Sequence, residues 1–264
     1  MRMTKNPEKS TKEDRQTKAT PELPENNQMS RLKIVVGIPA YNEEQYISEV
    51  VRKARRFTDE VIVVDDGSTD NTSQVAEVAG AVVIRHSVNK GYGETLKTCF
   101  EVTKANIPDI LVILDGDGQH DPDDIPRLLA PILSGEADVI IGSRFLGKVN
   151  NIPQYRKLGI GIITFLYNFA SKVKVSDAQS GFRAYGKEVM NAFTVTEIGM
   201  GASVEAIVKI REKGFNITEV PISCIYHSGS HSTNPVTHGL SVALTVVKLR
   251  LRNLLRRSIE GNGA

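Results

Sequence analysis

Asp109-Ile-Leu-Val-Ile-Leu114 runs directly into Asp115-Gly-Asp-Gly-Gln-His120. The apolar run predicts a buried strand, and the residues after it predict an acidic turn at the end of that strand. Asp115, Asp117 and Gln119 recur at every second residue, so in an extended turn their side chains project to the same side. Carboxylate and amide oxygens are the hard ligands that Mg²⁺ or Mn²⁺ prefers, and such a cation can hold a diphosphate.

A second apolar strand, Glu60–Val64, also leads into an acidic turn, Asp65-Asp-Gly-Ser-Thr-Asp70. Two strands that end in acidic loops predict one crevice at the carboxyl edge of a sheet. The adjacent carboxylates of Asp65 and Asp66 repel each other unless a positive or hydrogen-bonding group faces them. The base amine or ribose hydroxyls of a nucleoside would serve, and the ordinary alternative is a glycine turn before a capped helix.

Strand and helix signals alternate along the chain and predict an α/β domain whose mostly parallel sheet is flanked by helices. The expected strands are Leu32–Ile38, Glu60–Val64, Ala81–Arg85, Ile110–Leu114, Ala137–Gly142 and Phe215–Pro221. The expected helices cover about 43–57, 69–79, 93–105, 122–134, 154–170 and 203–213, and residues 143–153 and 177–183 are expected to be loops.

Composition sets broader limits on the class of protein. The chain has 264 residues, of which 40% are hydrophobic and 24% charged, as in an ordinary globular protein. Its formal charge of +2 gives no reason to expect a nucleic-acid partner, and two cysteines exclude a disulfide framework. We expect a polar disordered tail over residues 1–30, one domain over 31–235, and a basic amphipathic helix with a tail over 236–264.

No apolar run approaches the roughly 20 residues that span a bilayer. The apolar helix expected from Gln154 and the basic C-terminal helix Gly239–Arg257 could instead lie on an anionic membrane surface, and packing of either against the core is equally compatible with its sequence. The expected location is the cytoplasm, with peripheral attachment to the cytoplasmic face of a membrane.

The acidic turns and the turn after the first strand also have other possible interpretations. A calcium-binding EF-hand loop fails because Pro126 occupies its twelfth position and a strand precedes the turn. His120 could be a ligand, but a hard cation prefers oxygen. The turn Pro39-Ala-Tyr-Asn-Glu-Glu44 could bind a nucleoside or could simply cap a helix. The chain has no GxxxxGK[ST], GxGxxG or nucleophile-elbow motif.

Taken in order, these motifs resemble the family 2 glycosyltransferases of the GT-A fold, and most the dolichyl-phosphate mannosyltransferase-like branch. The resemblance implies a single Rossmann-like domain. It covers roughly residues 32–234 and is carried by Ile38-Pro-Ala-Tyr-Asn-Glu43, Val63-Val-Asp-Asp-Gly-Ser68, Asn89-Lys-Gly91, Leu114-Asp-Gly-Asp-Gly-Gln-His120, Ile141-Gly-Ser-Arg144, Tyr155-Arg-Lys157, Asp177-Ala-Gln-Ser-Gly-Phe182 and Glu219-Val-Pro-Ile222.

The resemblance also implies roles for individual residues. Those expected to bind the nucleotide are Pro39, Tyr41, Glu43, Val64, Asp66, Asp115 and Gly116. Asp115, Asp117 and Gln119 would hold Mg²⁺ or Mn²⁺, and Arg144, Arg156 and His231 would bind phosphate. Asp117, Arg144 and Asp177 would take part in catalysis. This chain departs from the family pattern in two places. The loop 226–234 lacks a Ser-Lys pair, for which His227 or His231 would substitute, and Ile160 stands in place of a serine.

The implied activity is the inverting, metal-dependent transfer of a sugar from GDP-mannose, UDP-glucose or UDP-N-acetylglucosamine to a polyprenyl (dolichyl) phosphate. One alternative acceptor is a hydroxyl of a lipid-linked glycan or polysaccharide, for which Asp177 would be the first residue to test as a base. A non-catalytic nucleotide-sugar-binding protein is the alternative from another functional class.

Overall fold

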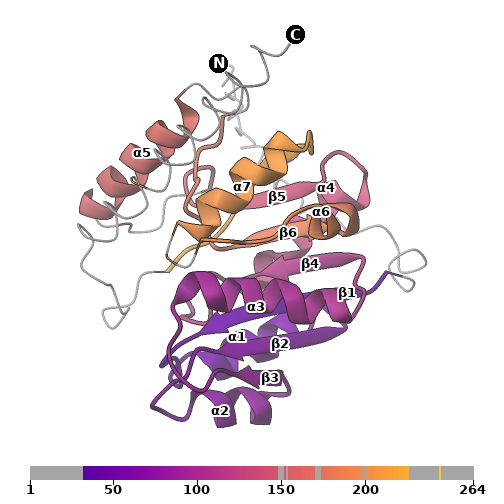
Figure 1. Ribbon diagram of the computed structural model, residues 1–264, viewed down its shortest axis with the longest axis vertical. Helices are drawn as coiled ribbons and strands as arrows, with labels where there is room; N and C mark the ends of the chain where they lie inside the picture. Colours follow the sequence, from indigo (N-terminus) through magenta and orange to yellow (C-terminus); the bar gives the residue numbers. More distant parts are fainter. Residues whose placement is uncertain are drawn as a thin grey trace, which may run out of the picture.

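The computed structural model describes residues 32–147, 152, 154–169, 174–197, 199, 201–225 and 244. Its centre is a seven-stranded sheet with the strand order β3-β2-β1-β4-β6-β5-β7 (Figure 1). The strands are β1 Ile34–Ala40, β2 Glu60–Asp65, β3 Val82–Arg85, β4 Ile110–Ile113, β5 Val139–Ser143, β6 Arg183–Gly186 and β7 Ile217–Pro221. The helices are α1 Ile47–Ala54, α2 Thr72–Ala79, α3 Tyr92–Ala105, the 3₁₀ helix η2 Pro122–Asp124, α4 Ile125–Leu133, α5 Gln154–Asn168, α6 Lys187–Ala192 and α7 Ala202–Glu212.

Helices cover both faces of the sheet, which explains why its strands are continuous apolar runs. Every residue of β1 is buried. Because successive side chains point to opposite faces, Val36 and Ile38 pack in one cluster with α1, α2 and α4. Val35 packs in a second cluster, with α3, α6 and α7.

The β1–β2, β1–β4, β2–β3 and β5–β7 pairs are parallel. The α/β class and the mostly parallel sheet expected from the sequence are therefore confirmed. The parallel strands β1, β2 and β4 end at the same edge of the sheet, so the turns that follow them converge there.

The strand β6 was not expected: residues 177–183 were interpreted as a loop, and no element was predicted between them and residue 203. It lies between β4 and β5 and is antiparallel to both. Its sequence, Arg-Ala-Tyr-Gly, is four residues long and has no apolar run. Only its neighbours in the sheet make it a strand.

Two helices also begin later than predicted: α1 begins at Ile47 and α2 at Thr72. The residues before them form turns that face the crevice. Among the described residues, no helix is both long and apolar enough to cross a membrane. The expected tail 1–30 lies outside the described residues, as does the C-terminal segment 236–264 apart from Leu244, so these boundaries stay predictions.

Candidate active site

The turns after β1 and β2 are tied to each other by side-chain hydrogen bonds. The Asn42 amide donates to Ser68 Oγ (2.9 Å), and the Thr69 amide donates to Asn42 Oδ1 (2.8 Å). The Glu43 amide donates to Thr72 Oγ1 (2.7 Å). Asn42 has φ of 57°, in the left-handed region that asparagine tolerates. These contacts fix the Glu43 backbone beside the crevice.

Asp65 is fully buried, and its partners come from the chain itself. Its carboxylate accepts hydrogen bonds from the Ser68 amide (2.8 Å) and from Ser73 Oγ, and Arg85 Nε lies 3.7 Å away. The hydrogen bond from Ser73 connects the turn to α2, and Arg85 places a positive charge beside the carboxylate.

The carboxylate of Asp66 also has partners from the protein itself, and Asp66 is only 3% exposed. The amides of Lys90 (2.9 Å) and Gly91 (2.8 Å) donate to its carboxylate, and His86 Nδ1 lies 2.7 Å away. The facing groups that the adjacent carboxylates require are therefore protein groups, and no nucleoside is needed to explain the pair. Asp66 holds the turn that opens α3, and its predicted contact with a nucleoside stays a prediction.

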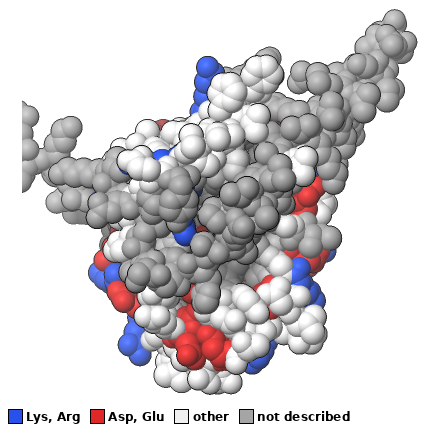
Figure 2. Space-filling view, turned by 90° about the vertical axis from the view of Figure 1, so that its left-hand side faces the viewer, with Lys and Arg blue, Asp and Glu red and all other residues white. Residues whose placement is uncertain are grey.

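Three carboxylates lie close enough at this edge of the sheet to influence one another: Glu43, Asp115 and Asp117. Burial, together with the charges of Asp117 and Asp115, raises the pKa of Glu43 to about 8. Burial and Asp117 likewise raise the pKa of Asp115 to about 7, partly offset by Arg144. Figure 2 looks onto this side of the molecule and shows a red area of Asp and Glu side chains in its lower part, with smaller red areas toward both edges. Carboxylates crowded in this way favour binding of a cation.

The residues present also fit the expected cation by their donor chemistry. Gln119 Nε2 donates to Asp117 Oδ2 (2.6 Å), and the Gln119 amide donates to Asp117 Oδ1 (2.9 Å). Rotation of the Gln119 amide would turn its oxygen toward the same carboxylate. No three Asp, Glu, His or Cys side chains are placed to hold an ion in the part of the chain that the structure describes. The amide oxygen of Gln119 would therefore complete a set with Asp115 and Asp117.

We expect the metal-free protein to lose thermal stability as the pH rises from about 4.5 to about 8. Glu43 and Asp115 retain protons in the folded state at pH values where their unfolded forms, with ordinary pKa values, have lost them. The folded state thus binds more protons than the unfolded state, so its stability falls with rising pH until these groups ionise in the folded state as well. Melting temperatures measured in chelator across this range check the prediction. Asp115→Asn should flatten the dependence, and a wild-type melting temperature that rises with pH would contradict it.

Arg144 and Asp177 form a bidentate ion pair at the end of β5. Arg144 Nε lies 2.6 Å from Asp177 Oδ2, and Nη2 lies 2.8 Å from Oδ1. Burial alone would raise the pKa of Asp177, but the Arg144 guanidinium holds it below its ordinary value. Glu219 of β7 accepts from the amides of Ser176 (2.6 Å) and Asp177 (3.0 Å) and braces this loop. Asp177 therefore orients Arg144, and its role as a base stays a prediction that this ion pair does not favour.

His120 is buried beside this ion pair. Its ring packs against Phe182, with centroids 5.6 Å apart, and neither ring nitrogen has a hydrogen-bond partner among the described residues. Burial and Arg144 lower the pKa of His120 to about 3, so the ring is neutral. The backbone pairs with Cys224, and the Ile225 amide donates to the Gln119 carbonyl (2.8 Å). This links the acidic turn to the segment that follows β7.

The other residues predicted for the site are spread between the sheet and its rim. Pro39, Val64 and Gly116 are buried at the strand ends, and the Val64 side chain belongs to the core. Tyr41 is 43% exposed, so its ring is available at the rim. Arg156 is half-buried on α5, and His231 lies outside the described residues.

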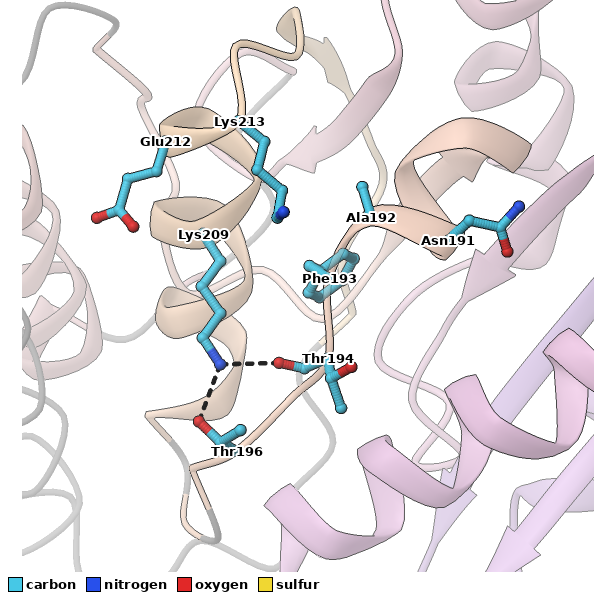
Figure 3. Close-up of a pocket in the computed structure, with 8 residues that line it drawn as sticks. All are labelled: Asn191, Ala192, Phe193, Thr194, Thr196, Lys209, Glu212 and Lys213. Atoms are coloured by element: carbon cyan, nitrogen blue, oxygen red, sulfur yellow. Dashed lines mark hydrogen bonds between the residues drawn. The ribbon is translucent and has the colours of Figure 1, made fainter.

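A cavity of about 440 Å³ lies away from the acidic turns, between α7 and the segment that follows α6 (Figure 3). Lys209 Nζ, which faces it, already contacts the Thr194 carbonyl, Thr196 Oγ1 and Glu205 Oε1. The lysine that lines the cavity therefore already has a counter-ion. The cavity itself is lined by other residues than those of the acidic turns.

Tyr92, Arg183 and Glu219 are near the crevice or brace it, but the sequence did not single them out for a role. Tyr92 Oη lies 3.4 Å from Asp115 Oδ1, and Arg183 is fully buried with its charge near Asp115. All three lie in or next to motifs noted in the sequence. An arginine between apolar residues, as in Phe182-Arg183-Ala184, was the available signal that a buried charge has a specific partner.

The family model described as Glycosyl transferase family 2 matches residues 35–193, a stretch that contains both acidic turns and the Arg144–Asp177 pair. The chain belongs to glycosyl transferase family 2. The family expected from the sequence is thus confirmed, and this member of it is a glycosyltransferase.

Two dolichyl-phosphate transferases are similar to this chain over most of its length. The UDP-N-acetylglucosamine–dolichyl-phosphate N-acetylglucosaminyltransferase of Methanococcus voltae is 32% identical over 249 residues, which cover 84% of this chain and 98% of that protein. The dolichyl-phosphate hexose transferase of Haloferax volcanii is 32% identical over 228 residues, which cover 85% of this chain and 96% of that protein.

Solved structures confirm the GT-A fold. Glucosyl-3-phosphoglycerate synthase from Mycobacterium tuberculosis, in complex with Mn²⁺, UDP and phosphoglyceric acid, matches with a TM-score of 0.68 and 23% identity. The match covers 83% of this chain and 78% of that one.

Proposed function

We propose that this glycosyltransferase moves a sugar from a nucleotide-diphosphate donor to a polyprenyl phosphate with the help of Mg²⁺ or Mn²⁺. The observation that carries the proposal is the group of Glu43, Asp115 and Asp117 carboxylates at the carboxyl edge of the sheet, with the Gln119 side chain hydrogen-bonded to Asp117. The names of the Methanococcus and Haloferax relatives support the acceptor class, and the Mn²⁺ in the solved neighbour supports the cation.

The chain's own residues would bind the donor and stabilise its leaving group. Tyr41 presents an exposed ring to the base. A bound divalent cation would stabilise the charge that develops on the departing diphosphate. Arg144 is near enough to lower the pKa of Asp115, and Asp177 holds its guanidinium in one orientation. Such a preorganised positive charge stabilises a leaving diphosphate without reorganisation during the reaction.

The ion pair between Asp177 and Arg144 favours a phosphate acceptor over a hydroxyl acceptor. A phosphate monoester has a second pKa of about 6 and is already ionised near neutral pH, so it can attack without a base. A hydroxyl acceptor needs a base, and the residue predicted for that role is ion-paired with Arg144. Direct attack on the anomeric carbon would invert its configuration.

The deciding experiment offers GDP-mannose, UDP-glucose and UDP-N-acetylglucosamine separately, with dolichyl phosphate in detergent and Mn²⁺. We expect one donor to give a chloroform-soluble glycosyl phosphate, and chelator to stop its formation. Transfer only to a glycan hydroxyl would select the alternative acceptor. Tight nucleotide binding without any transfer would select the non-catalytic alternative.

The exposed face of α5 supports membrane contact, which the proposed acceptor requires. Four apolar side chains, 52% to 69% exposed, follow one another at helical spacing: Leu158, Ile162, Phe165 and Phe169. Residues spaced in this way form a single stripe along a helix. Exposed apolar side chains in such a stripe are typical of a helix that lies at a membrane surface. We propose that this stripe contacts the bilayer that holds the acceptor.

We expect the double variant Leu158→Ser/Phe165→Ser to bind vesicles of anionic phospholipid at least about tenfold more weakly than wild type, because two large apolar side chains no longer enter the bilayer. Co-flotation with vesicles measures the change. Val78→Ser on α2 is the matched control, because Val78 is 84% exposed outside the stripe. Equal loss of binding in the control, or no loss in the double variant, would refute the role of the stripe.

A further inference from the structure

Residues outside the acidic turn also contact the carboxylate of Asp115. Tyr92, the first residue of α3, places its Oη 3.4 Å from Asp115 Oδ1. Gly181, in the loop before β6, approaches the other oxygen so closely that a Cβ there would lie 2.2 Å from Oδ2. One carboxylate oxygen therefore faces a phenol, and the other faces a glycine backbone.

Ser203, on α7, connects Tyr92 to a buried arginine. Tyr92 Oη lies 3.3 Å from Ser203 Oγ, and Arg183 Nη1 donates to the Ser203 carbonyl (2.5 Å). Arg183 Nη2 donates to the Ala178 carbonyl (3.0 Å). The contacts thus join four elements around Asp115: the end of β4, α3, β6 and α7.

The buried position of Arg183 needs a compensating negative charge. A guanidinium removed from water is unfavourable unless it is hydrogen-bonded and electrostatically compensated. The Arg183 side chain is buried, and its Nε has no hydrogen-bond partner in the described part of the chain. The positive charge of Arg183 acts to lower the pKa of Asp115 and so favours the ionised carboxylate.

We propose that Tyr92, which Ser203 links to Arg183, and Gly181 are positioning residues that hold the Asp115 carboxylate in the orientation needed for the metal and the diphosphate. This inference rests on the proposed function, in which Asp115 helps to bind both. A ligand that is fixed by outer contacts binds its ion better than one that must be ordered on binding. The insertion of β6 between β4 and β5 brings Gly181 and Arg183 to this point.

Tyr92→Phe tests the phenol contact, because it removes only Oη and keeps the ring. We expect the dissociation constant for Mn²⁺, measured by loss of the electron paramagnetic resonance signal of free Mn²⁺, to rise about threefold to tenfold. The melting temperature of the metal-free protein should change little. Tyr167→Phe is the matched control, since it removes another buried phenol, from α5, and should leave Mn²⁺ binding unchanged.

Gly181→Ala tests the close approach to Oδ2. The new methyl group can be accommodated by displacement of the Asp115 carboxylate, so we expect Mn²⁺ to bind about tenfold or more weakly. Gly186→Ala is the control at the other end of β6, where a Cβ would meet its nearest atom, the Asp138 carbonyl oxygen, at an ordinary 3.4 Å. Donor KM and kcat measured on the same proteins separate a binding defect from a general loss of active enzyme.

The outcomes distinguish this inference from the function on which it rests. If the wild-type protein does not bind Mn²⁺, the proposed metal site is wrong and the positioning role falls with it. If wild type binds Mn²⁺ and transfers sugar but both variants match it, only the positioning role is refuted. Should Gly181→Ala fail to fold, Tyr92→Phe alone decides.

Discussion

Asp117→Ala is expected to lower sugar transfer at least about a thousandfold while the protein stays folded, because the variant loses a carboxylate that would hold the cation against the leaving diphosphate. Asp117 also raises the pKa of Glu43 and Asp115, so its removal relieves repulsion within the site. The metal-free variant should therefore melt no lower than wild type. Turnover with Mn²⁺ and the melting temperature provide the two measurements.

Added Mn²⁺ gives this prediction a second readout. An ion that binds only the folded protein raises its melting temperature, and the rise should vanish in Asp117→Ala. Asp123→Ala is the control, because Asp123 lies six residues away at the surface and forms an exposed ion pair with Arg56 (3.0 Å). Full turnover by Asp117→Ala, or wild-type turnover that survives chelator, would overturn the assignment of the acidic turn.

Asp177→Ala is expected to lower folding stability by about 3–5 kcal/mol, because it removes the carboxylate that pairs with Arg144 in a largely buried position. Asp177 is fully buried, and the Arg144 side chain is 11% exposed. Urea unfolding of the metal-free protein measures the change. Transfer activity should fall as well, since Arg144 loses the partner that orients it.

Asp123→Ala again supplies the comparison, since it breaks an ion pair whose side chains are 60% and 44% exposed. Such surface pairs contribute less than about 1 kcal/mol. Similar losses in the two variants would show that the Arg144–Asp177 pair has no special structural role. The lowered pKa of Asp177 adds a further check. Its stabilising contribution is present above its ordinary, unfolded-state pKa and should be lost as the pH falls below about 4.

The order of the elements and the position of the crevice follow from local sequence. Apolar runs such as Ile110–Ile113 form strands because both faces of the sheet are covered, and the Asp-Gly turns after them mark the carboxyl edge. The acidic turn that contains Asp117 and Gln119 could be located for the same reason: its chemistry is carried by consecutive residues.

The partners of the charged groups depend on tertiary structure. Asp66 is occupied by residues 20 to 25 positions away, and Tyr92 meets Ser203 across 111 positions. Arg144 meets Asp177 because Glu219 of β7, the strand paired with β5, holds the loop of Asp177 beside the end of β5. Backbone periodicity and turn chemistry are properties of neighbouring residues. Side-chain pairing depends on which strands are adjacent, and that is settled when the whole sheet assembles.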